Sequence, residues 1–190
     1  MIEFIEGSHT YLLDGVIIPS VTQILQKKFP DKYKGVDSAI LSKKASYGTL
    51  LHKCIELIEK KKIKRPIAYC KRYLNIDIYQ EESIKQYLEI KKKYNIEVLE
   101  SEKTVHYKNK YCGTLDMKGL VNGKKAIIDI KTTYELDKEY VSWQDSMYEL
   151  ADEPQDKLYV LWLPKGHLGD LYEVSRIPKN QIIDLIDKES

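Results

Sequence analysis

The chain is poor in cysteine, and its cysteines are far apart. The three cysteines are Cys54, Cys70 and Cys112 in a sequence of 190 residues. A disulfide framework or a cysteine metal cluster needs closely spaced pairs, so this spacing argues against both kinds of structure. The three side chains are therefore predicted to be buried thiols.

Long apolar runs are also missing. No run approaches the roughly 18 residues that a membrane span needs, and the N-terminus has no signal-peptide pattern. Hydrophobic residues make up 43% and charged residues 32% of the chain, proportions that are typical of a globular protein. The length and the lack of internal repeats predict one domain over residues 1–190. We therefore expect a cytoplasmic protein without a membrane partner.

A strong overall charge is absent too, because the net charge is only +2. Positive charge is nevertheless clustered at Lys60–Lys62, Lys64 and Arg65, and again at Lys91–Lys93. Basic clusters can be footprints for a polyanion such as DNA. Lysines at the end of a helix are also solvated and favoured by the helix dipole, and each cluster taken alone supports this second interpretation.

The sequence does contain a strong hairpin signal between Tyr111 and Thr133. Two apolar-alternating runs are joined there by Asn122-Gly123, the best short-range indication of a two-residue turn. With that turn, Asp116 lies directly opposite Asp129 on the neighbouring strand. Lys131 follows two residues after Asp129 and therefore shares the same face of the hairpin.

The other face of this hairpin is apolar. It consists of Leu115, Met117, Val121, Ala126, Ile128 and Ile130. One face is thus expected to be buried while the other presents two carboxylates and an amine. Opposed like charges destabilise a sheet, and a bound divalent cation such as Mg²⁺ is the simplest way to offset them. A solvated face with an incidental pair of acids is the alternative, and the added lysine favours the metal.

The rest of the chain alternates strand and helix patterns. An N-terminal β-hairpin closed by Asp14-Gly15 is expected first, followed by a short helix capped by Ser20. Further helices are predicted over 38–62, 81–94 and 137–150 and after Pro178, strands over 96–107, 158–163 and 168–176, and a loop or lid over 63–78. This order predicts an α/β fold with a mixed central sheet flanked by helices.

Three residues of the long helix lie on one face, because Gly48, His52 and Glu56 are spaced four apart. Glycine inside a helix costs about 1 kcal/mol relative to alanine, so Gly48 predicts a close approach by another element. His52 and Glu56 form either an ordinary surface pair or a pair that projects into the cleft of the two aspartates.

A third acid depends on the length of the turn before the hairpin. A three-residue loop over 108–110 places Tyr107 opposite Tyr111 and brings Glu102 opposite Asp116. A two-residue loop places Lys103 there instead, so Glu102 is an auxiliary candidate.

These residues fit metal-assisted hydrolysis of a phosphodiester. Carboxylates can hold one or two divalent ions, which polarise the scissile phosphate and lower the pKa of a bound water. Lys131 can position that water or stabilise the charge that develops on the phosphate. A purely structural salt-bridged triad explains fewer of these features.

Four segments resemble the PD-(D/E)XK nuclease superfamily, and in particular its RecB-like and phage exonuclease branch. The nuclease motif is matched by GTLD (Gly113–Asp116) and, after the turn, by DIK (Asp129–Lys131). GTLLHKCIE (Gly48–Glu56) resembles the G-x-x-x-H helix of that branch, and WQDSMY (Trp143–Tyr148) resembles its Q-x-x-x-Y motif. PSVTQIL (Pro19–Leu25) is similar to the start of these proteins. A D…DxK pattern alone is common by chance, so the order of the four blocks carries the resemblance.

The resemblance implies a restriction-endonuclease-like core and one or two bound Mg²⁺ or Mn²⁺ ions. Asp116 and Asp129 would bind metal, with help from the backbone carbonyl of Ile130, and His52 would be a further ligand. Many members have Glu where this chain has Asp129. Some relatives hold an iron–sulfur cluster with four cysteines, and the three scattered cysteines here argue against one.

The resemblance also implies roles for the remaining matched residues. Glu56 would contact metal-bound water or groups around it, and Lys131 would be the catalytic lysine. Gln144 and Tyr148 would orient that lysine or contact DNA near the scissile phosphate.

We therefore expect a metal-dependent DNA exonuclease of a phage or mobile element, active in recombination or replication on single strands or duplex ends. A structure-specific or nicking endonuclease of the same fold is the runner-up. The third candidate is a non-catalytic nucleic-acid-binding or interaction protein, against which the intact set of Asp116, Asp129 and Lys131 argues. A phage protein of this kind would act in the cytoplasm of the bacterial host, with a homo-oligomer or a recombination partner as further expectations.

Overall fold

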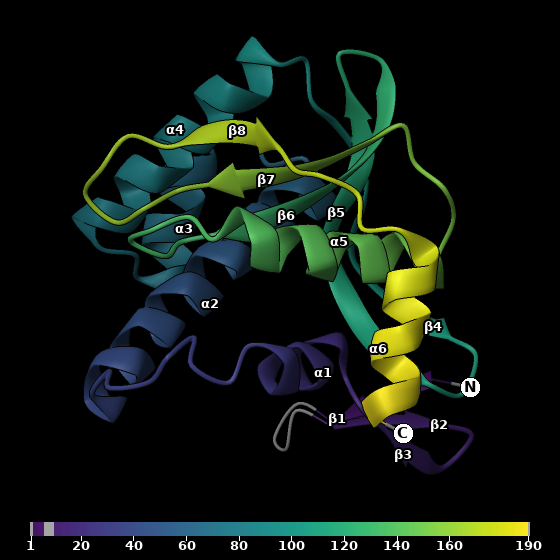
Figure 1. Ribbon diagram of the computed structural model, residues 1–190. Coiled ribbons are helices and arrows are strands. Elements are labelled where there is room, and N and C mark those ends of the chain that lie inside the picture. Colours follow the sequence, from purple (N-terminus) through teal and green to yellow (C-terminus); the bar gives the residue numbers. More distant parts are fainter. Residues whose placement is uncertain (1, 6–9, 190) are drawn as a thin grey trace.

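A computed structural model describes residues 2–5 and 10–189 and contains a mixed sheet of five strands (Figure 1). Neighbouring strands follow the order β4-β5-β6-β7-β8. Their bounds are Glu97–Tyr107, Tyr111–Val121, Lys124–Lys131, Lys157–Trp162 and Asp170–Glu173. The pair β6 and β7 is parallel and the other neighbours are antiparallel. The predicted mixed sheet is confirmed, although β8 covers only part of the predicted strand over 168–176.

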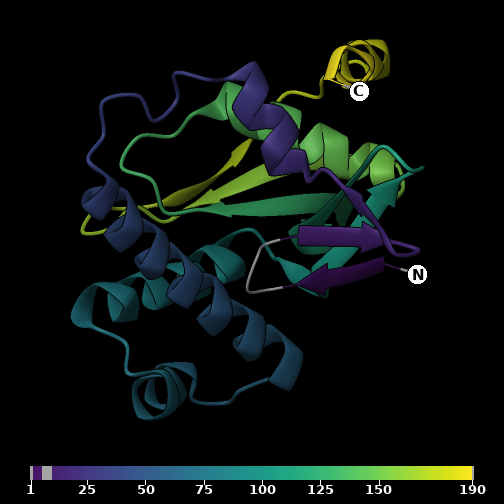
Figure 2. The same cartoon turned by 90° about the horizontal axis from the view of Figure 1, so that it is seen from below.

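Helices cover both faces of this sheet (Figure 2). One face carries α2 (Ser38–Lys61), α3 (Pro66–Leu74) and α4 (Ile78–Lys93), and the other carries α1 (Val21–Lys28), α5 (Lys138–Ala151) and α6 (Lys179–Glu189). The chain is thus an α/β protein with its sheet between two helical layers, as the sequence predicts. Within the described ranges, no helix has the length and apolar character of a membrane span.

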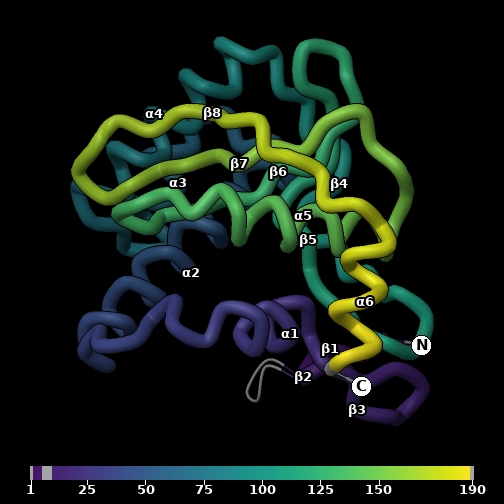
Figure 3. The backbone as a smooth tube through the Cα atoms, in the orientation of Figure 1, coloured from purple at the N-terminus to yellow at the C-terminus, as the bar shows by residue number. Residues whose placement is uncertain are grey.

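A small antiparallel sheet precedes the main one. It consists of β1 (Ile2–Ile5), β2 (Thr10–Leu13) and β3 (Val16–Ile18). Asp14 and Gly15 take φ of 51° and 81°, which the predicted tight turn between β2 and β3 requires. The amide of Cys112 donates to the carbonyl of Pro19 at 3.0 Å, which joins this sheet to the start of β5. At the other end of the chain, α6 contacts α1 (Figure 3).

Residues 63–78 form a helix for most of their length, so the predicted loop or lid is wrong. α3 begins at Pro66, because the first position of a helix has no amide partner to lose. It ends before Asn75, which has φ 51°. Asp77 and Gln80 then form a capping box, so α4 begins before the predicted start at residue 81.

The hairpin between β5 and β6 has the predicted register. Val121 pairs with Lys124 and Met117 with Ile128, where the ladder ends. Beyond it, Asp116 is joined to β6 by a hydrogen bond from the amide of Ile130, and the direct opposition of Asp116 and Asp129 stays a prediction. Asn122 and Gly123 take φ of 49° and 79°, as a two-residue turn of this kind needs.

The turn between β4 and β5 has three residues. Tyr107 therefore pairs with Tyr111, and the register brings Glu102 opposite Asp116. Glu102 has φ 53°, which is a left-handed conformation in the middle of a strand. The ladder is interrupted at this point, between the pairs that Ser101 and Lys103 make.

The alternation of side chains in β5 breaks at Asp116. Leu115 packs among the residues around α1 and α5, whereas Met117 packs among those around α2 and α4. In a regular strand these two residues would share a face, so the predicted single apolar face is wrong for Leu115. The predicted carboxylate face is itself covered, because Ile127 is fully buried against the α5 side and Asp129 is only 2% exposed.

Candidate metal centre

Asp116 lies at the break in β5 and is held by two other elements. Its Oδ2 accepts a hydrogen bond from the amide of Ile130 in β6 at 2.6 Å. Its Oδ1 lies 3.3 Å from Nδ1 of His52 in α2. Burial alone would raise the pKa of Asp116, but the charges of His52 and Lys131 outweigh it and lower that pKa. The carboxylate is therefore ionised and fixed in place.

His52 reaches Asp116 because α2 comes very close to the end of β6. A Cβ atom at Gly48 would lie 2.9 Å from Oγ1 of Thr132, nearer than such atoms normally approach. The predicted close approach at Gly48 is thus confirmed, and His52 lies one helical turn further on. Burial would lower the pKa of His52, but the neighbouring Asp116 carboxylate raises it overall.

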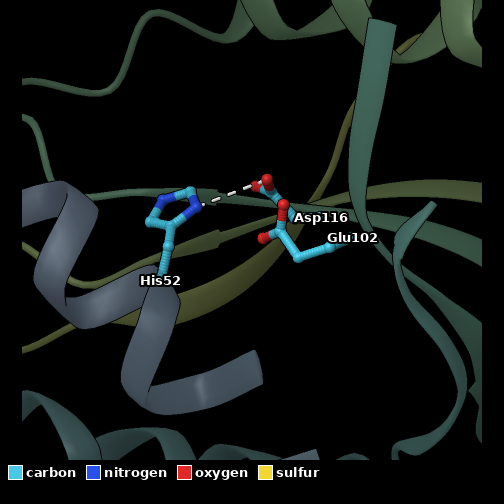
Figure 4. A group of neighbouring side chains, drawn as sticks. All are labelled: His52, Glu102 and Asp116. Atoms are coloured by element: carbon cyan, nitrogen blue, oxygen red, sulfur yellow. Dashed lines mark ion pairs between the residues drawn. The ribbon is translucent and has the colours of Figure 1, made fainter. Parts of the chain in front are cut away.

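Glu102 completes a group of three metal-binding side chains. His52, Glu102 and Asp116 each offer one ligand atom, and these atoms lie within 4.8 Å of one another (Figure 4). Burial and the charge of Asp116 raise the pKa of Glu102 to about 7. A divalent cation would relieve this repulsion, and oxygen ligands with one imidazole suit Mg²⁺ or Mn²⁺.

The buried carboxylate of Asp129 forms an ion pair with the partly exposed Lys131 next to this group. The Lys131 Nζ lies 2.9 Å from Oδ1 and 2.6 Å from Oδ2 of Asp129. Burial raises the pKa of Asp129 to about 6 in spite of the lysine. The same pair raises the pKa of Lys131, since the charges of Asp129 and Asp116 outweigh the effect of burial. Asp129, predicted as a metal ligand, is therefore occupied by Lys131 and lies outside the group of three.

Glu56 is one turn beyond His52 but is engaged elsewhere. Its carboxylate lies 2.7 Å from Nζ of Lys53 and 2.8 Å from Nζ of Lys60. These two lysines outweigh the effect of burial and lower the pKa of Glu56. The contact of Glu56 with metal-bound water stays a prediction. The role of the Ile130 carbonyl as a metal ligand also stays a prediction, and the amide of the same residue anchors Asp116.

The side chains of Gln144 and Tyr148 are brought together on α5, where Nε2 of Gln144 donates to the Tyr148 hydroxyl at 3.1 Å. Both side chains are buried, and Oε1 of Gln144 has no hydrogen-bond partner among the described residues. A Cβ atom at Gly113 would lie 2.6 Å from Cε1 of Tyr148. The glycine of the GTLD segment thus makes room for the tyrosine under β5.

Lys131 and Gln144 also line a cleft of about 210 Å³. Lys32 contributes a second positive charge to its wall, 2.5 Å from Oδ2 of Asp137 and 3.8 Å from the ring centre of Tyr140. A larger surface hollow of about 490 Å³ lies along β7 and β8 and contains none of the predicted site residues. The smaller cleft is therefore the one that gives access to the ion pair.

Asp145 is a buried carboxylate that the sequence analysis did not single out. It is fully buried, and neither of its oxygens has a hydrogen-bond partner among the described residues. Burial and the nearby charge of Asp129 raise its pKa well above the usual range. The available signal was its place between Val141 and Tyr148, because residues four before and three after it share its face of the helix and these two are apolar and aromatic.

Comparisons with known proteins give little further information. No family model matches the chain, and a search of curated proteins found no relative. One similar solved structure is described as the crystal structure of SSO0001. It is 18% identical with a TM-score of 0.38, over 87% of this chain and 82% of that chain. A likeness at this level carries no argument about function.

Proposed function

We propose that the protein is a Mg²⁺- or Mn²⁺-dependent deoxyribonuclease with a PD-(D/E)XK core. The observation that carries the proposal is the meeting of three strands and a helix at Asp116. The hydrogen bond from the Ile130 amide to Asp116 brings the Asp129–Lys131 pair beside Asp116, and α2 adds His52. This arrangement supports the roles that the family resemblance implies for Asp116, His52 and Lys131.

The residues divide into a binding part and a part that acts on the substrate. Asp116, His52 and Glu102 would hold the cation, which when bound polarises a phosphate and acidifies a water. Asp116 needs little reorganisation for this, because Ile130 already fixes one of its oxygens. Lys131 lies at the cleft, where its ammonium can donate a hydrogen bond to the water or to the phosphate.

Asp129 positions Lys131 in this proposal, and its carboxylate would be a further ligand of the same cation if the ion pair opened. Asp116 and Asp129 would then both bind the metal, and Lys131 would bind the phosphate. This division of roles would explain why two carboxylates lie close together. Gln144 lines the same cleft, and its carbonyl oxygen accepts no hydrogen bond from any residue that the structure describes. That oxygen is a suitable acceptor for the Lys131 ammonium.

Within this activity we favour an exonuclease of a phage or mobile element that acts in recombination or replication. The support is the resemblance of the four sequence segments and their order. DNA in the form of single strands or duplex ends is the proposed substrate, in the cytoplasm of a bacterial host.

The deciding experiment compares a linear duplex with its closed circular form, each incubated with Mg²⁺ and with Mn²⁺. An exonuclease degrades the linear DNA and leaves the circle intact. Cutting of the circle would instead identify the endonuclease alternative. The matched control is Asp116→Asn, which should abolish either activity. Binding of DNA without hydrolysis under all these conditions would overturn the proposed enzyme and favour a non-catalytic binding protein.

A further inference from the structure

The positive charge of the protein is concentrated in one short segment. Residues 60–73 contain seven of the 31 lysines and arginines and none of the 29 aspartates and glutamates. The rest of the chain therefore has 24 basic and 29 acidic residues, a formal charge of −5. The segment consists of the end of α2, the connection and most of α3. A polyanion would thus be attracted to this end of the molecule.

Most of these cations have no acidic partner in the part of the chain that the structure describes. Lys60 pairs with Glu56, and Lys71 pairs with Glu81. The other five form no ion pair with any described residue, and all are exposed: Lys61, Lys62, Lys64, Arg65 and Arg72. Their charges are consequently available to an external ligand.

Two tyrosines of α3 lie among these cations. The rings of Tyr69 and Tyr73 have centroids 4.7 Å apart with an interplanar angle of 43°. Tyr69 packs against the core, whereas Tyr73 is 61% exposed. The guanidinium of Arg72 lies 5.4 Å from the centre of the Tyr73 ring, and Nζ of Lys61 lies 5.9 Å from that of Tyr69. The core-packed ring of Tyr69 thus supports the exposed ring of Tyr73, and each ring has a cation close to it.

This surface is connected to the candidate metal centre through α2. His52 and Lys61 are nine residues apart on that helix, which corresponds to about 14 Å along its axis. Lys60 lies between them, and its charge acts on Glu102. A polymer that leaves the centre along α2 would therefore meet the cations at the end of the helix.

We propose that Lys61, Tyr69, Arg72 and Tyr73 form a binding surface for single-stranded DNA, which we call the basic–aromatic surface. The inference extends the proposed function and rests on it for the identity of the polymer. Arginine and lysine bind the phosphates, and the exposed ring of Tyr73 stacks on a base. Stacking on a protein ring needs a base that is free of its neighbours, so the surface selects a single strand over a duplex.

The first test measures the binding of a fluorescent oligo(dT) by anisotropy, in EDTA so that no hydrolysis occurs. Tyr73→Ala should weaken binding about tenfold, the effect of losing one stacked base, and Tyr73→Trp should restore or tighten it. The matched control is Tyr79→Ala, because Tyr79 is also exposed and has Lys165 at 4.6 Å from its ring centre. Equal affinity of the wild type and Tyr73→Ala would refute the stacking role.

The second test separates charge from stacking. Lys61→Gln with Arg72→Gln should weaken binding and flatten its dependence on the logarithm of salt concentration by about 0.7 per lost phosphate contact. Lys179→Gln, an exposed lysine of α6, is the control. Binding of duplex DNA should respond to the charge variants but not to Tyr73→Ala. If the duplex loses as much affinity as oligo(dT) with Tyr73→Ala, the proposed selection of single strands is wrong.

These measurements do not depend on nuclease activity. If the protein binds oligo(dT) through this surface but never hydrolyses DNA, the basic–aromatic surface stands and the proposed function fails. If the protein hydrolyses DNA and the surface variants bind and cut long single strands like the wild type, the surface is wrong and the proposed function stands. An acidic protein as the true ligand would show as no binding of oligo(dT) by any form.

Discussion

Nδ1 of His52 lies 3.3 Å from Oδ1 of Asp116, and this contact ties α2 to the sheet where β5 changes face. The two residues are 64 positions apart in the sequence. Their meeting depends on Gly48, which lets α2 approach Thr132. The contact therefore depends both on a glycine within α2 and on the position of Asp116 in the distant β5–β6 hairpin.

Removing one of the three ligand side chains, His52, Glu102 or Asp116, should weaken the binding of Mn²⁺ to the isolated protein. We expect His52→Ala or Glu102→Gln to lower the affinity at least about tenfold, a loss at least as large as that seen for residues around metal ligands. Isothermal titration calorimetry measures this directly. The control is Glu56→Gln, because Lys53 and Lys60 already hold that carboxylate. An equal loss for Glu56→Gln would show that Glu56 belongs to the centre.

Removing Lys131 should destabilise the metal-free protein. Lys131→Ala leaves the buried Asp129 carboxylate without its counter-charge, a change that costs about 3 kcal/mol when one partner of a buried pair is lost. Urea unfolding at about pH 8 measures the difference. The double variant Lys131→Ala with Asp129→Asn should recover much of the stability without recovering hydrolysis. If the single variant is as stable as the wild type, the pair contributes nothing to the fold.

The stability of the metal-free protein should fall as the pH rises from about 5 to about 8. The pKa values of Glu102, about 7, and Asp129, about 6, lie above those of the same groups in an unfolded chain. The folded form therefore binds more protons than the unfolded form in this window, and its stability is lost as these groups ionise. The raised pKa of His52 acts in the same direction.

Thermal unfolding in EDTA across this pH range tests the sign. Glu102→Gln should reduce the slope, since it keeps the side chain neutral at every pH, while the raised pKa values of Asp129 and Asp145 leave the remainder. Millimolar Mg²⁺ should raise the stability most at the alkaline end, where the carboxylates are ionised. A stability that increases from about pH 5 to about pH 8 in EDTA would contradict the prediction.

Glycine at position 48 should be needed because of the contact with Thr132, and not because of the conformation of α2. Gly48→Ala places a methyl group 2.9 Å from Oγ1 of Thr132, so it should destabilise the protein and displace His52. In the background of Thr132→Ala the clash is gone, and the same change should stabilise the protein by up to about 1 kcal/mol through its helix propensity. A double-mutant cycle of unfolding free energies measures this reversal. Additive effects of the two changes would show that the contact is unimportant.

Local patterns in the sequence were sufficient for much of the fold. Asn122-Gly123 favours a two-residue hairpin turn, and that turn determines the pairing of β5 with β6. The capping box at Ser20 marks the start of α1 in the same local way. Helix α3, which was predicted as a loop or lid, shows the limit of such signals, because Arg65-Pro66 fits a loop and a helix start equally well.

The sequence by itself determined which residues could meet along one hairpin, because a tight turn sets the register and the register sets opposite neighbours. It thus placed Asp116 near Asp129 and Lys131, and made Glu102 conditional on the length of one loop. Only the tertiary structure decided the surroundings of these residues: the break in alternation at Asp116, the burial of Asp145, and the engagement of Glu56 by lysines. The physical reason is that burial and charge pairing depend on elements distant in sequence, which no local pattern encodes.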